Sequence, residues 1–120
     1  MAADLAAPIN HPEWATEFFA GPASENDDGS VSVSVPMMGG PARMNIEADV
    51  DRGIIDVYLA PDQVPFGDPI PVRLVPNGDG VDVLWTLGRP DGIPDPAWQQ
   101  GLDSMARELA NLKARHENHR

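Results

Sequence analysis

The sequence predicts an α+β fold in which an antiparallel meander sheet of about five to six strands curves around one long C-terminal helix. Three observations predict it. The middle of the chain alternates apolar and polar residues in short runs that are joined by turn-forming residues. Residues 95–117 carry apolar side chains at helical spacing. Helical signals occur at both ends of the chain and none between the strands, which is typical of α+β proteins.

The N-terminal part, residues 2–20, is predicted to be helical in two short pieces that Pro8 separates. Asn10 or His11 serves as the cap of the second piece, and Pro12 falls in its first turn. Residues 23–29 are polar and predict a loop.

Five strands are predicted at residues 30–35, 42–50, 54–59, 70–75 and 81–88. Serines alternate with valines in the first of them, and charged residues alternate with apolar ones in the second. One face of the sheet is therefore apolar, and we expect it to point inward. Its members are Val31, Val33, Val35, Met44, Ile46, Ala48, Val50, Ile55, Val57, Leu59, Val72, Leu74, Val83, Trp85 and Leu87.

The C-terminal helix has a clear start and a clear inner face. Asp95 suits the N-cap, and Pro96 suits the first helical position. A stripe of apolar residues at spacings of three and four follows, made by Trp98, Leu102, Met105, Leu109 and Leu112. Gly101 marks either a close approach to another backbone or a tolerated residue.

Composition indicates one small domain with many turns. The chain has 120 residues with 13 prolines and 11 glycines, a length that gives a single core but little room for a large cavity. We expect the short, Ala-rich residues 1–9 and the tail 117–120 to be flexible.

Charge and residue usage exclude several kinds of function. The net charge of −11 repels phosphate backbones and anionic lipid, so we expect neither nucleic acid nor membrane as a partner. The sequence lacks cysteine, a signal peptide and a membrane span, and we expect a cytoplasmic protein.

The sequence contains no catalytic or metal-binding motif, and we expect no cofactor. Its histidines are a cap residue, His11, and two tail residues, His116 and His119, so no metal site is expected. The serines at 30, 32 and 34 face away from the valines without a nearby base.

The apolar inner face leaves two interpretations open. It forms either a close-packed core or a cavity for a hydrophobic small molecule, with Met37, Met38 and Phe66 at its entrance. The residues expected to line such a cavity are Val33, Val35, Met44, Ile46, Val57, Leu59, Trp85, Trp98, Leu102, Met105 and Leu109.

Three segments resemble the START-like (SRPBCC) superfamily, whose members include polyketide cyclase/dehydrase-like proteins. They are residues 10–14 (Asn-His-Pro-Glu-Trp), residues 48–56 across a hairpin, and residues 85–90 (Trp-Thr-Leu-Gly-Arg-Pro) with the long helix behind them. The resemblance implies a helix-grip fold that binds a hydrophobic molecule under the C-terminal helix without catalysis. Cyclase/dehydrase activity is the alternative, and a one-residue register slip would bring its candidate groups inward. These are Arg43, Asp56, Tyr58 and Arg73.

The chain departs from this superfamily at its start. Members open with a strand that pairs beside the last strand, whereas residues 1–9 do not resemble a strand. The strand at 81–88 then becomes an exposed apolar edge, and such edges attract partners. A homodimer through strand 81–88, acting as a structural or interaction module, is therefore a further alternative.

Overall fold

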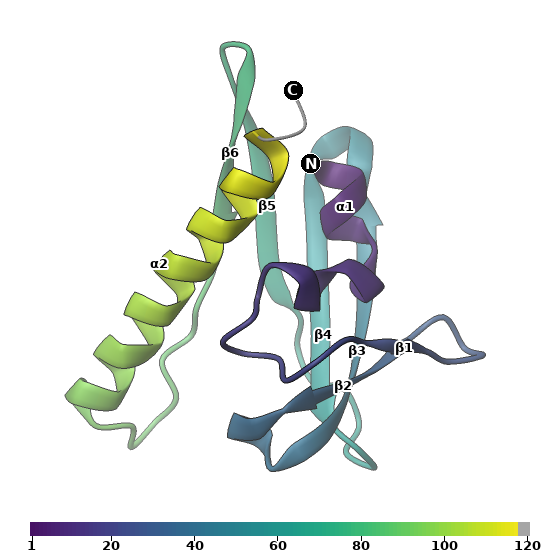
Figure 1. Ribbon diagram of the computed structural model, residues 1–120, viewed down its shortest axis with the longest axis vertical. Helices are drawn as coiled ribbons and strands as arrows, with labels where there is room; N and C mark the ends of the chain where they lie inside the picture. Colours follow the sequence, from purple (N-terminus) through teal and green to yellow (C-terminus); the bar gives the residue numbers. More distant parts are fainter. Residues whose placement is uncertain (118–120) are drawn as a thin grey trace.

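A computed structural model describes residues 1–117 and shows one antiparallel sheet with a long helix in front of it (Figure 1). The strand order is β1-β2-β3-β4-β5-β6, so each strand pairs with its neighbour in the sequence. The predicted α+β meander is confirmed. The elements are α1 (Ala2–Ala6), η1 (Pro8–Glu13), β1 (Ser24–Glu25), β2 (Val31–Val35), η2 (Pro36–Met38), β3 (Gly40–Asp49), η3 (Val50–Arg52), β4 (Ile54–Pro61), β5 (Ile70–Asn77), β6 (Gly80–Trp85) and α2 (Asp95–Glu117).

Each of the five predicted strands differs from the observed one by one to three residues at one end or both, and the sixth strand, β1, has no predicted counterpart. The short strand β1 lies in the segment predicted as a loop and pairs with β2, with Ser24 opposite Ser32. The last strand ends at Trp85 instead of residue 88. Its final contact with β5 is the hydrogen bond that the Thr86 N–H donates to the carbonyl of Pro71 at 3.1 Å. The glycine and proline that follow do not continue a strand.

The register of the sheet puts the predicted apolar face inward. Met44 lies opposite Leu59 and Ile46 opposite Val57 in the β3–β4 pair. The valines of β2, with Met44, Ile55, Val57, Val72 and Leu74, are buried.

Three of the residues predicted to face inward are exposed, namely Ala48, Val50 and Leu87, and Leu87 lies beyond the end of β6. Val50 belongs to the turn η3 and not to a strand. Ala48 lies near the end of β3, next to that turn, where its side chain has no covering layer.

The N-terminal segment, residues 1–20, covers part of the sheet. Helix α1 packs against β3 and β4, and Leu5 is 0% exposed. Burial of one leucine stabilises by about 1.5–3 kcal/mol, which favours an attached segment, while the flexibility of residues 1–9 stays a prediction. Residues 118–120 of the predicted flexible tail lie outside the described residues, and Glu117 is the last residue of α2.

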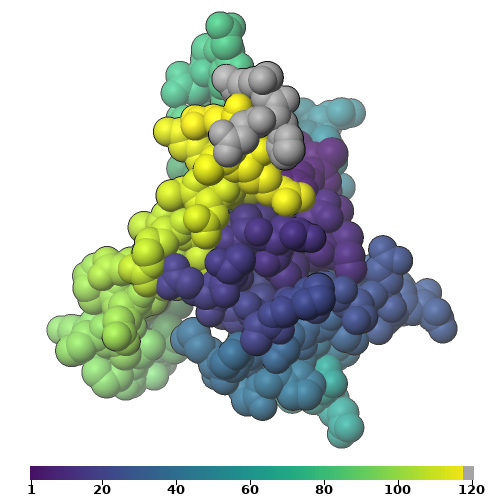
Figure 2. Space-filling view, viewed as in Figure 1, coloured from purple at the N-terminus to yellow at the C-terminus, as the bar shows by residue number. Residues whose placement is uncertain are grey.

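Helix α2 is held by the N-terminal segment, as the contact between the two in Figure 2 illustrates. Asn111 donates to the carbonyl of Trp14 at 3.2 Å, and Arg107 pairs with Glu17 at 2.9 Å. Near the end of the helix, Arg115 pairs with Asp4 at 2.9 Å. These contacts position α2 through residues 4–17, and the paired residues are 90 or more positions apart in the sequence.

Asp4 is the acidic partner at the end of α2. Burial by itself raises its pKa, but hydrogen bonds from Arg115 and His116, together with their charges, outweigh burial and hold the pKa below 3.8. A carboxylate with a lowered folded pKa contributes stability above its unfolded pKa, and this contribution is lost as the pH falls through the folded value. The attachment of α2 to α1 is therefore intact at neutral pH.

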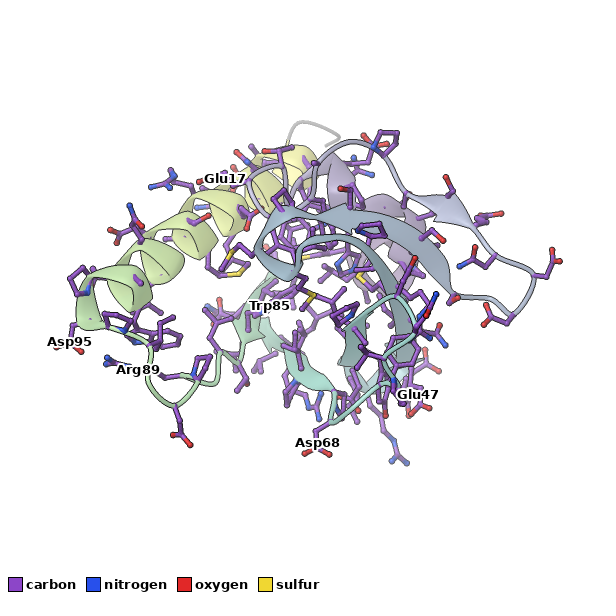
Figure 3. All side chains as sticks on the ribbon, turned by 90° about the horizontal axis from the view of Figure 1, so that it is seen from below. Glu17, Glu47, Asp68, Trp85, Arg89 and Asp95 are labelled. Atoms are coloured by element: carbon purple, nitrogen blue, oxygen red, sulfur yellow. The ribbon has the colours of Figure 1, made fainter. Side chains whose placement is uncertain are left out.

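The first half of α2, residues 95–104, extends past the edge strand β6 (Figures 1 and 3). Trp98 and Leu102 are only half-buried there, whereas Leu112 in the second half is fully buried. The guanidinium of Arg89 lies over the ring of Trp98, 5.9 Å from its centroid, and also pairs with Asp95. The loop before the helix, and not the sheet, therefore packs against its start.

Two glycines have opposite surroundings. An added Cβ at Gly101 would meet nothing within 4 Å, so this glycine is tolerated in the helix and marks no close approach. Gly53 has a φ of 69°, and an added Cβ would overlap the carbonyl oxygen of Leu74. The N–H of Leu74 donates to the Gly53 carbonyl at 2.8 Å, so the two backbones touch.

These surroundings predict opposite effects of the same substitution. Gly101→Ala is expected to raise the free energy of unfolding by about 0.5–1 kcal/mol, because alanine is the better helix former. Gly53→Ala is expected to lower it by about 1–3 kcal/mol, because alanine is strained at positive φ and meets Leu74. Urea denaturation followed by circular dichroism measures both changes. A Gly101→Ala protein less stable than the original would show that α2 packs closely at this position.

Candidate ligand-binding cavity

A cavity of about 90 Å³ lies between the sheet, the N-terminal segment and α2. The strands supply its floor, η1 and the turn that follows supply one wall, and α2 supplies the other. Trp85, at the end of β6, lies on the helix side of the sheet (Figure 3). The lining residues are His11, Trp14, Ala15, Phe18, Phe19, Met44, Val57, Leu59, Ile70, Trp85, Met105 and Glu108.

The cavity contains five of the residues predicted to line it. These are Met44, Val57, Leu59, Trp85 and Met105. They come from β3, β4, β6 and the middle of α2. These five residues therefore lie together between the sheet and the helix.

The other six predicted lining residues lie elsewhere. Val33 and Val35 are buried in the core cluster, which also contains Trp14, Ala15 and Phe19 of the N-terminal segment. Ile46 packs against the core without reaching the cavity. Trp98 and Leu102 are on the part of α2 beyond β6, and Leu109 lines an open groove beside that strand.

Sequence reasoning missed the contribution of the N-terminal segment and of Glu108. Of these residues, Glu108 had a readable signal, since it follows Met105 by three positions and precedes Leu112 by four. That spacing puts it on the inner face of α2. The contributions of His11 and Trp14 had no such signal, because η1 is a short 3₁₀-helix with no long apolar period.

Three aromatic rings form one side of the cavity. The Trp14 ring lies 5.5 Å from that of Trp85, edge to face, and 5.4 Å from that of His11. His11 and Trp85 are 6.0 Å apart, so each ring contacts the other two. Such arrangements add about 0.5–1.5 kcal/mol per aromatic pair to the energy of burial.

His11 is a buried member of η1 and not a helix cap, which corrects the sequence-based prediction. Its Nε2 lies 2.8 Å from the carbonyl oxygen of Leu5, so the neutral ring donates its proton there. Burial lowers the pKa of His11 and outweighs the opposing effects of the Leu5 carbonyl and of Asp4. The ring is therefore neutral at physiological pH, and Nδ1 keeps its lone pair.

Glu108 is the acidic residue of the cavity wall and is only 3% exposed. One of its carboxylate oxygens accepts hydrogen bonds from the backbone N–H groups of Glu17 and Phe18, at 3.1 and 3.2 Å. Burial raises the pKa of Glu108, and these two hydrogen bonds only partly offset the increase. The carboxylate thus joins α2 to the N-terminal segment at an energetic cost of desolvation.

The polar groups considered for catalysis lie on the other face of the sheet. Arg73 pairs with Asp56 at 2.9 Å, and the Tyr58 hydroxyl donates to Glu47 at 3.4 Å. Because Ile55 and Val57 are buried in the same strand, the register slip that would bring these groups inward does not occur.

The predicted entrance is also wrong. Phe66 packs on the outer face, with the guanidinium of Arg43 4.7 Å from its ring centroid. Met37 is 80% exposed in η2, and neither it nor Met38 lines the cavity.

No protein-family model and no curated protein matches the chain. Within residues 1–117, no three His, Asp or Glu side chains are placed to hold a metal ion. Neither helix of that part of the chain has the length and apolar character needed to cross a membrane.

Two substitutions separate the roles of the Glu108 charge and its hydrogen bonds. Glu108→Ala leaves two backbone N–H groups without an acceptor and is expected to lower the free energy of unfolding by about 1–3 kcal/mol. Glu108→Gln keeps an accepting oxygen and is expected to be at least as stable as the original protein at pH 7. Urea denaturation of all three proteins checks this order.

The pH dependence of the same proteins gives a second readout. A carboxyl group with a raised folded pKa contributes stability that is present below its unfolded pKa and is lost as the pH rises through the folded value. Glu108→Gln removes this loss, so its stability relative to the original protein rises with pH above about 4.3. If Glu108→Gln is as damaging as Glu108→Ala, then the charge itself holds the segments together.

Proposed function

We propose that this protein binds a small apolar molecule in the cavity beneath α2, without catalysis. The observation that carries this proposal is a partly open, largely aromatic and aliphatic space to which the sheet, the N-terminal segment and α2 all contribute. Its two titratable residues, His11 and Glu108, both use hydrogen bonds to the protein backbone. They therefore have structural roles that account for their presence.

The size of the cavity limits the buried part of the ligand. Pockets for drug-sized molecules measure about 300–1,000 Å³, whereas a cavity of about 150 Å³ takes up a benzene ring. At about 90 Å³, the space matches a small ring or the end of a short chain. A larger ligand would insert only one apolar group.

The exposure of the lining residues indicates where such a group enters. The residues on the side of η1 and the central strands are buried, including His11, Trp14 and Met44. Ile70, Trp85 and Met105 are only half-buried. A ligand would therefore enter between β5, β6 and the middle of α2.

The proposal also includes membership of the START-like superfamily. A meander sheet behind a long C-terminal helix is the arrangement expected of a START-like protein, and a cavity under that helix is where such a protein would bind its ligand. The cytoplasmic location expected from the sequence is part of the proposal as well.

Toluene is a suitable probe for a cavity of this size. We expect it to shift the methyl resonances of Met44, Val57 and Met105 in NMR spectra and to raise the melting temperature. Ala15→Leu fills the space from its wall and is expected to weaken toluene binding at least about tenfold, a difference of about 1.4 kcal/mol.

Ala110→Leu is the matched control, because Ala110 is an exposed residue of α2 that does not line the cavity. It is expected to bind toluene like the original protein. The proposal fails if saturating toluene shifts none of the three methyl groups, or if Ala15→Leu binds it unchanged.

Self-association through β6 is a second candidate function, favoured by the exposure of this strand. Within residues 1–117, strand β6 pairs only with β5, and Leu84 is 55% exposed. Five consecutive residues, Gly80 to Leu84, line an open groove of about 660 Å³, so the groove runs along the edge of the strand. The half-buried start of α2 extends past the same edge.

A second copy fits this edge without opposing like charges. Antiparallel pairing of two β6 strands centred on Val83 sets Val81 opposite Trp85 and Asp82 opposite Leu84. This pairing is symmetric and keeps the apolar face of each sheet on the same side.

Light scattering at micromolar concentration tests this candidate, and a dimer is expected. Leu84→Lys puts a charge on the edge strand and is expected to give a monomer. Val75→Lys is the control, because Val75 is a similarly exposed residue on β5, one strand further in, and it is expected to stay dimeric. A monomeric original protein contradicts the candidate.

A further inference from the structure

The outer edge of β6 carries backbone groups that can pair with another strand. The Thr86 N–H donates to the Pro71 carbonyl, and Thr86 continues the register of β5 and β6. Because hydrogen-bonding directions alternate along an antiparallel strand, the N–H and C=O groups of every second residue point the other way. In the part of the chain that the structure describes, the backbones of Val81, Val83 and Trp85 therefore face an edge with no paired strand.

Charge selects the register in which a second copy pairs with this edge. Two symmetric antiparallel registers set most of these backbone groups opposite one another, one centred on Asp82 and one centred on Val83. Centring on Asp82 sets two carboxylates directly opposite each other, which is destabilising. Centring on Val83 avoids this contact, and it places Val81 of the second copy opposite Trp85.

Val81 is a residue on the helix side of β6 that its own chain leaves partly uncovered. Its side chain points to the same face as those of Val83 and Trp85, since side chains alternate along a strand. It is 37% exposed and does not line the cavity of its own chain. It lines the open groove beside β6 instead, together with Leu109 and Leu112. A change at Val81 therefore leaves the lining of its own cavity intact.

Trp85 is the lining residue that the second copy reaches. It is the last residue of β6, is half-buried, and lies where the cavity opens. Residues that oppose each other in an antiparallel pair have Cα atoms about 4.5–5.5 Å apart, so their side chains touch. In Figure 1 the β5–β6 hairpin extends beyond the other strands, and in the dimer its tip lies beside the end of the other copy's β6.

We propose that a second copy of this chain completes the cavity: its Val81 packs against Trp85 and covers the opening. Ligand binding and dimer formation then strengthen each other. This inference rests on both functions proposed above and adds the coupling between them. Covering about 30 Å² more of a ligand's apolar surface strengthens its binding about threefold.

Toluene titrations followed by NMR test the coupling in the dimer and in the monomer. Light scattering at the same protein concentration reports the state of each sample. We expect Leu84→Lys, the monomeric variant, to bind toluene at least about threefold more weakly than the original protein. Leu84 does not line the cavity, so this loss comes from the missing second copy. Val75→Lys is the control, and it is expected to stay dimeric and to bind toluene like the original protein.

Val81→Ala identifies the residue that acts across the interface. At a protein concentration at which light scattering shows a dimer, it is expected to weaken toluene binding at least about twofold, because it uncovers part of the opening. In the Leu84→Lys monomer it is expected to change nothing, because Val81 does not line its own cavity. Val64→Ala is the matched control, since Val64 is a similarly exposed valine in the loop between β4 and β5. It is expected to leave toluene binding unchanged.

Thermodynamic linkage gives a second readout. If toluene prefers each site of the dimer threefold, saturating toluene lowers the dissociation constant of the dimer about ninefold, since two sites contribute. Light scattering over a dilution series measures this change. The indole resonance of Trp85, identified by its loss in Trp85→Phe, is expected to shift when the dimer dissociates.

The outcomes separate the coupling from the two functions on which it rests. If the original protein dimerises and binds toluene, but Leu84→Lys binds toluene equally well, the coupling is wrong and both functions stand. An equal effect of Val81→Ala in the dimer and in the monomer would also contradict it, because the effect would then arise within one chain. A monomeric original protein, or one that binds no toluene, overturns the coupling together with the corresponding function.

Discussion

The position of α2 depends on the contact between Glu108 and the backbone of residues 17 and 18, and the cavity depends on the position of α2. Glu108 accepts two hydrogen bonds from this turn, and the fully buried Leu112 lies one turn further along the helix. Near the end of the helix, the guanidinium of Arg115 donates a hydrogen bond to the carboxylate of Asp4. The N-terminal segment thus lies between the helix and part of the sheet, and it sets how far α2 stands from the strands.

This attachment has two consequences for function. Because the second half of α2 is held by residues 4–18, its first half is free to extend past β6, where Trp98 packs with Arg89 instead of the core. Space remains under the middle of the helix, and the aromatic rings of His11, Trp14 and Trp85 border it. Glu108 and Phe18 both hold the helix and line the candidate binding site, so stability and ligand binding share these residues.

Local patterns in the sequence predict the sheet and α2 well, because alternation and helical spacing are properties of neighbouring residues. Strands β2 to β5 and the inner stripe of α2 follow from such patterns. The role of residues 1–20 does not, since Leu5, His11 and Trp14 become important only through contacts with distant parts of the chain. The same limit explains why Trp98 and Leu102, although on the predicted stripe, do not reach the cavity: the direction of α2 is set by Glu108 and Asp4.

Amide hydrogen exchange along α2, followed by NMR, tests this account most directly. The amides of residues 105–115 are expected to exchange as slowly as those of the central strands β3 and β4, because opening them requires the N-terminal segment to separate from the helix. The amides of residues 99–103 are expected to exchange faster, through local fraying of the overhanging half. Equal protection along the whole helix would show that its first half is packed as tightly as its second, and it would contradict the origin of the cavity described here.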